Sequence, residues 1–132
     1  EGSAALARAF ECGAFMREAT NTVADSICVD VPRNGLHALR QLKAHGGQVV
    51  RVSDKQILAA QARLSSTAGL FTEPAGAAAF AGFLEVRPRL SGGSVAVVLA
   101  TGNGLKDTVA ASRSVEIPEK VITKLEEVER SW

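Results

Sequence analysis

An unbroken run of six apolar residues, Val95 to Ala100, is the feature that most restricts the fold of this chain. A strand with one face in water alternates apolar and polar residues, whereas a continuous aliphatic run is typical of a strand buried on both faces. Gly92 and Gly93 precede the run and Thr101 follows it. The sequence therefore predicts a strand from Ser94 to Ala100 inside a mostly parallel sheet.

Segments typical of strands and of helices alternate along the rest of the chain. Short valine-rich runs at 26–31 and 48–52 predict two further strands. Helices are predicted at 2–17 with an interruption near Gly13, at 35–45 with Asn34 as cap, at 53–67 from a Ser53–Gln56 capping box, at 73–85 from Glu73-Pro74, and at 118–132. This alternation favours an α/β fold, a mostly parallel three-layer sheet with flanking helices.

Composition excludes several classes of function. At 132 residues the chain is one domain or one part of a larger one. The net charge of +1, without a stripe of Lys or Arg, argues against non-specific nucleic-acid binding. The stretch from Leu64 to Leu84, uncharged apart from Glu73, is broken by Pro74 and by glycines, so no membrane span is expected. No signal-peptide pattern opens the chain. We expect a soluble cytoplasmic protein with no nucleic-acid or membrane partner.

The cysteines and histidines predict no metal site. Cys12 and Cys28 lie 16 residues apart without a CxxC or CxxH neighbour, so they are expected to be small buried apolar residues. His37 and His45 are eight residues apart on one predicted helix, too far apart to hold a metal without a third ligand. Both imidazoles are expected in solvent.

Thr101 lies where a ligand would bind in an open parallel sheet, at the carboxyl end of a strand. Gly102 and Gly104 remove side chains there, so a flat ligand or another segment of backbone can approach closely. The residues alone leave two interpretations open. The threonine hydroxyl binds a ligand, or it is buried and bonds to the local backbone.

Two sequence motifs together resemble a known family. T-E-P-A-G-A-A-A-F-A-G at 72–82 and A-T-G-N-G-L-K-D-T at 100–108 resemble the carboxyl part of the threonine synthases, which belong to the tryptophan-synthase-β-like, fold type II pyridoxal-phosphate enzymes. The stretches at 31–40 and 46–57 resemble the same family in order and spacing. Threonine dehydratases contain motifs similar to E-P-A-G-A-A, whereas the motif T-G-N-G-L-K-D favours threonine synthase.

The resemblance implies roles for four residues toward pyridoxal 5'-phosphate. Thr101 would bond to the pyridine nitrogen of the cofactor, with Gly102 and Asn103 beside the ring and Glu73 near it. Simpler interpretations are a turn residue for Asn103 and a carboxylate at a helix N-terminus for Glu73. Lys106 does not match the family's Schiff-base lysine and is expected to form a surface ion pair or to contact a substrate phosphate. No catalytic residue is assigned.

The resemblance also implies how the chain relates to a whole enzyme. Residues 1–132 would be the C-terminal portion of a catalytic domain, with the Schiff-base lysine and the phosphate loop in an N-terminal remainder, so the piece alone is expected to be inactive and to self-associate. The enzyme would be a homodimeric lyase of threonine biosynthesis that converts O-phospho-L-homoserine and water to L-threonine and phosphate. The alternatives are a threonine or serine dehydratase-like lyase and a non-catalytic α/β binding module.

Overall fold

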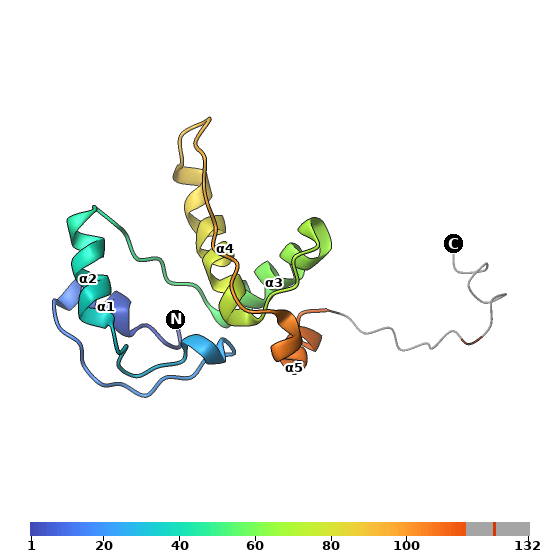
Figure 1. Ribbon diagram of the computed structural model, residues 1–132, viewed down its shortest axis with the longest axis horizontal. Helices are drawn as coiled ribbons and strands as arrows, with labels where there is room; N and C mark the ends of the chain where they lie inside the picture. Colours follow the sequence, from blue (N-terminus) through green and yellow to red (C-terminus); the bar gives the residue numbers. More distant parts are fainter. Residues whose placement is uncertain (116–122, 124–132) are drawn as a thin grey trace.

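The computed structural model describes residues 1–115 and residue 123, and within them the chain is helical. In Figure 1, α3 and α4 occupy the middle of the molecule, and α1 and α2 lie together at one end. The helices are α1 (Ala5–Cys12), η1 (Asp25–Ile27), α2 (Gly35–Ala44), α3 (Asp54–Ala68), α4 (Pro74–Val86), η2 (Arg87–Arg89), η3 (Gly104–Lys106) and α5 (Thr108–Ser112). The helix predicted at 118–132 lies outside the described residues.

Local sequence signals set the helix ends much as predicted. Ser53 and Gln56 form the reciprocal capping box that begins α3, and Gly69 ends α3 in the left-handed conformation. Pro74 occupies the first turn of α4, where its missing N–H costs no hydrogen bond. Asn34 precedes α2, but its side chain makes no capping hydrogen bond, so that detail of the prediction is wrong.

The core lies between α3 and α4 and is built largely from small residues. Alanine side chains let the two helices approach closely, because little volume separates their backbones. The buried cluster consists of Ala24, Val52, Ile57, Ala60, Leu64, Ala77 and Ala81. This packing fixes the N-terminal turn of α4 relative to α3.

The predicted strands do not form within the described residues. The β-type pairing found there is an isolated antiparallel bridge between Thr72 and Asn103. Residues 25–27 form η1 in place of the start of the first predicted strand, and residues 48–52 run without regular structure. A strand needs a hydrogen-bonded neighbour, and the described residues provide none beside these segments. The three-layer sheet is thus not formed by these residues on their own.

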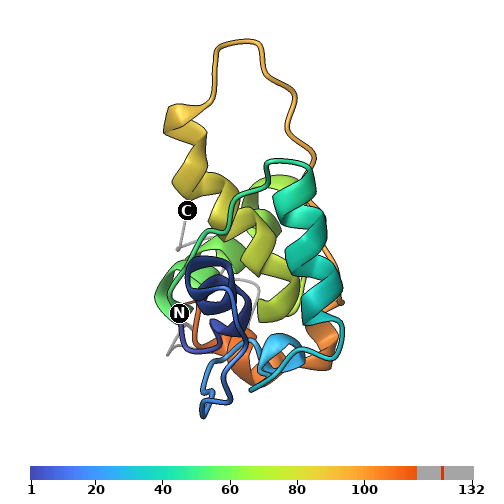
Figure 2. The same cartoon turned by 90° about the vertical axis from the view of Figure 1, so that its left-hand side faces the viewer.

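The segment that should have been the most deeply buried strand is exposed. Val95, Val97 and Leu99 are 93%, 86% and 72% exposed, so the prediction of burial on both faces is wrong here. Both views show the chain leaving the end of α4, looping outward and returning toward α5 (Figures 1 and 2). In the described part of the chain, no helix is long and apolar enough to cross a membrane.

Candidate functional site

The two motifs that carry the family resemblance lie against each other. Thr72 and Asn103 form the antiparallel bridge, and the amide of Glu73 donates a hydrogen bond to the carbonyl of Gly102 at 3.1 Å. The amide of Gly104 donates to the carbonyl of Phe71 at 3.0 Å. We call residues 71–73 and 101–104 the motif junction. Segments about 30 residues apart in the sequence thus meet at the N-terminus of α4.

Glycines permit the close contacts of the motif junction. A Cβ on Gly76, in the first turns of α4, would lie 1.6 Å from the carbonyl oxygen of Thr101. Gly102 has a φ of +62° in the left-handed region, and a Cβ there would lie 2.0 Å from Oε1 of Glu73. The space beside each glycine is therefore filled by the chain itself, and only hydrogen fits there.

A buried glutamine on α3 contacts the motif junction. Gln61 on α3 is 1% exposed, and its Nε2 donates to the carbonyl oxygen of Thr72 at 2.7 Å. Its Oε1 and the hydroxyl of Thr72 are buried without a partner in the described residues. Gln61 was not among the residues predicted from the sequence, although its spacing from Ile57 and Leu64 places it on the buried face of α3.

Glu73 is the centre of a small polar cluster. Its side chain is 10% exposed. Oε1 accepts a hydrogen bond from the hydroxyl of Ser26 at 3.2 Å and forms an ion pair with Nζ of Lys106 at 3.1 Å. The Lys106 side chain is 60% exposed, so this contact is a surface ion pair, one of the two contacts predicted for Lys106 from the sequence. A cleft of about 280 Å³ beside the cluster is lined by Asp25, Ser26, Glu73, Pro74, Ala75, Lys106 and Asp107.

Thr101 lies on the surface of the motif junction. The residue is exposed, and its hydroxyl makes no hydrogen bond to any other described residue. Thr101 is thus not buried by the described residues. Asn103 has an extended backbone, and its Oδ1 accepts a hydrogen bond from the amide of Leu105 at 2.9 Å. The four residues assigned to the cofactor by the resemblance all lie in the motif junction: Glu73, Thr101, Gly102 and Asn103.

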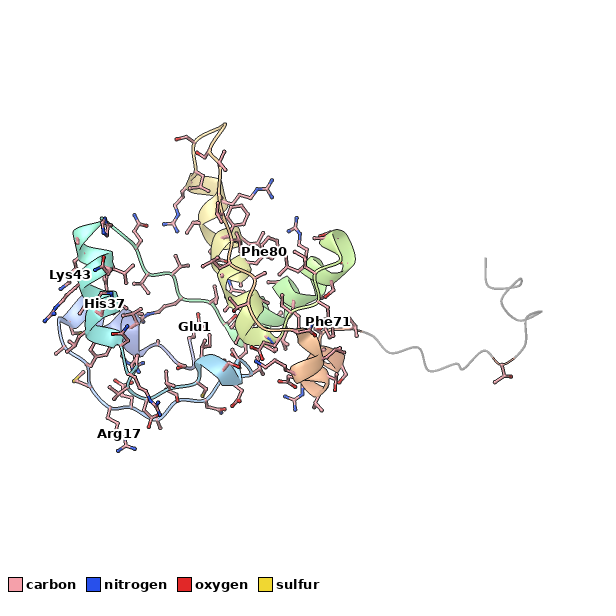
Figure 3. All side chains as sticks on the ribbon, in the orientation of Figure 1. Glu1, Arg17, His37, Lys43, Phe71 and Phe80 are labelled. Carbon is pink, nitrogen blue, oxygen red and sulfur yellow. The ribbon has the colours of Figure 1, made fainter. Side chains whose placement is uncertain are left out.

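The other singled-out residues lie elsewhere. His37 projects from α2, on the far side of the molecule from Phe71 in the motif junction (Figure 3). Both histidines are exposed, as predicted. Cys12 is exposed and Cys28 is partly buried, so the expectation of two buried cysteines is wrong. Across residues 1–115 and 123, no three His, Cys, Asp or Glu side chains gather into a group that could hold a metal ion.

Comparison with known proteins connects this arrangement to a family. Residues 1–102 match the family described as pyridoxal-phosphate dependent enzyme. The chain is 32% identical over 124 residues to the threonine synthase of Halalkalibacterium halodurans, an alignment that covers 92% of this chain and 34% of that protein. It is 32% identical over 133 residues to the threonine synthase of Methanosarcina acetivorans, which covers 97% of this chain and 33% of that protein.

A third relative is the threonine synthase of Methanocaldococcus jannaschii, 35% identical over 102 residues, or 76% of this chain and 25% of that protein. The chain thus spans about a third or less of the length of these relatives. The family match covers more than half of the chain and includes Glu73, Thr101 and Gly102. The chain is therefore a member of the pyridoxal-phosphate dependent enzyme family.

Proposed function

We propose that this chain is the C-terminal portion of a threonine synthase-type lyase that converts O-phospho-L-homoserine and water to L-threonine and phosphate. The observation that supports it is the motif junction, in which the two family motifs meet and leave the hydroxyl of Thr101 exposed and unpaired. The similarity to three threonine synthases supports the choice of reaction within the family.

The exposed hydroxyl at the motif junction supports a site for a pyridine ring. A neutral hydroxyl can donate a hydrogen bond to an unprotonated ring nitrogen, and Thr101 offers one that no described residue uses. Its backbone is held in place, because its carbonyl packs against Gly76 and the adjacent Gly102 carbonyl accepts from Glu73. Thr101 would hold the ring nitrogen, with Gly102, Asn103 and Glu73 supporting the turn that carries it.

A hydroxyl partner, in place of a carboxylate, affects the protonation of the ring nitrogen. When bound, the cofactor withdraws electrons from the substrate, which allows protons to leave its carbon chain and the phosphate to leave from the γ carbon. A carboxylate partner would favour a protonated ring nitrogen through charge pairing, whereas Thr101 favours a neutral one. In this proposal Thr101 orients the ring and keeps its nitrogen unprotonated.

The remainder of the protein would also complete the fold. Val95, Val97 and Leu99 stand at alternate positions in the sequence and are all exposed, so in a strand they would share one face that needs covering. Within the described residues, no backbone hydrogen bond joins 95–100 to another segment. We propose that 94–100 becomes a central strand of the mostly parallel sheet when it pairs with residues outside this chain.

A product assay tests the proposed reaction. The full protein that contains this chain, loaded with pyridoxal phosphate, is expected to release inorganic phosphate from O-phospho-L-homoserine and to form L-threonine in equal amounts. L-threonine and L-serine serve as the comparison substrates. Release of ammonia and a 2-oxo acid from these two, without threonine formation from the phosphate ester, would identify a dehydratase and contradict the proposed reaction.

A further inference from the structure

Lys106 lies outside the four residues assigned to the cofactor, yet it contacts Glu73, whose side chain packs on Gly102 next to Thr101. Its ammonium pairs with Oε1 of Glu73 at 3.1 Å. That same oxygen would lie 2.0 Å from a Cβ on Gly102, so the carboxylate packs directly on this glycine. Lys106, Glu73 and Gly102 thus form a continuous line of contact to Thr101.

The burial of the two partners makes the pair asymmetric. The Glu73 side chain is 10% exposed, while that of Lys106 is 60% exposed. A nearly buried carboxylate needs its partners, and without Lys106 it would keep only the hydroxyl of Ser26 among the described side chains. We expect an unpaired Glu73 to turn toward solvent, which would remove its contact with Gly102.

The surroundings of Lys106 argue against a site for a phosphate group. The cleft beside it is lined by three carboxylates, Asp25, Glu73 and Asp107, and by this single ammonium. An excess of negative charge repels an anionic ligand at this range. The ammonium is therefore better suited to hold Glu73 than to bind a substrate phosphate.

We propose that Lys106 is a positioning residue, which fixes the Glu73 carboxylate against Gly102 and so fixes the orientation of the Thr101 hydroxyl. This inference rests on the proposed function, because it assumes that Thr101 meets the cofactor ring. It assigns Lys106 no contact with the cofactor and no covalent step.

The test uses the full protein and measures pyridoxal-phosphate affinity by titration, together with the circular dichroism of the bound cofactor at saturation. Lys106→Met is expected to weaken cofactor binding about tenfold, since a charge-assisted hydrogen bond is lost. It should also reduce the cofactor's circular dichroism, which arises from a fixed orientation in an asymmetric site. Lys106→Arg should retain both the affinity and the circular dichroism of the unaltered protein. Lys55→Met, at an exposed lysine of α3, should change neither.

A double-mutant comparison separates an action through Glu73 from a direct one. In a Glu73→Gln background, Lys106→Met is expected to cause little further loss. An unchanged affinity and spectrum in Lys106→Met, or an equal loss in both backgrounds, would overturn the proposal. If Thr101→Val weakens binding while Lys106→Met does not, this inference alone fails. If the unaltered protein binds no pyridoxal phosphate, the proposed function fails and this inference fails with it.

Discussion

Replacing Gly76 by alanine is expected to lower the free energy of unfolding by about 3 kcal/mol and to abolish cofactor binding. The new Cβ would lie 1.6 Å from the carbonyl oxygen of Thr101 and 2.7 Å from its carbonyl carbon. Both are backbone atoms and cannot move aside as a flexible side chain would. The 101–104 segment must leave α4, which breaks the hydrogen bond from Glu73 to Gly102.

Gly82 provides the matched control for Gly76, because it lies in the same helix. Among the described residues, a Cβ on Gly82 would meet Val50 alone, at 4.0 Å, which is ordinary van der Waals contact. Gly82→Ala is therefore expected to be neutral or to stabilise the protein by up to about 1 kcal/mol, through its higher helix propensity. Urea unfolding followed by circular dichroism measures both variants. Equal effects of the two substitutions would contradict the close contact between α4 and Thr101.

Replacing Gln61 by alanine is expected to destabilise the protein by about 3 kcal/mol. The substitution opens a cavity between α3 and the motif junction, because Gln61 is 1% exposed. It also removes the donor to the carbonyl of Thr72, which lies in a buried residue. The measurement is the free energy of unfolding in urea.

Gln61→Leu separates the two contributions of the glutamine. Leucine fills most of the volume and removes the unpaired Oε1, so a loss of only about 1 kcal/mol is expected for the missing hydrogen bond. Gln41→Ala, at an exposed position of α2, is the control and should change stability by less than about 0.5 kcal/mol. If Gln61→Ala has as little effect as Gln41→Ala, Gln61 does not support the junction.

Signals within a few neighbouring residues could be predicted from the sequence. The Ser53 capping box, the Gly69 stop and the Pro74 start are confirmed, because each depends on one helix end alone. The role of Thr101 toward a ligand stays a prediction, because its exposure is shared with most of the segment that precedes it. Family resemblance, rather than periodicity, was needed to name the cofactor.

Features that depend on distant partners could not be predicted. Residues 94–100 have the composition of a buried strand, yet burial requires neighbouring strands and helices that the described residues do not supply. Gln61 and the pairing of Glu73 with Lys106 and Ser26 depend on which segments meet in space. Periodicity shows which face of a helix is buried, but it does not show which carbonyl a buried amide will reach.

The central claim is that the hydroxyl of Thr101 meets an unprotonated pyridine nitrogen, and nuclear magnetic resonance of an isotope-labelled ring nitrogen tests it most directly. In the full protein, the labelled nitrogen should show the chemical shift of an unprotonated, hydrogen-bonded pyridine. Thr101→Ser should keep that shift, and Thr101→Val should move it to the value of a pyridine nitrogen without a hydrogen bond. A protonated nitrogen in the unaltered protein, or the same shift in Thr101→Val, would contradict the claim.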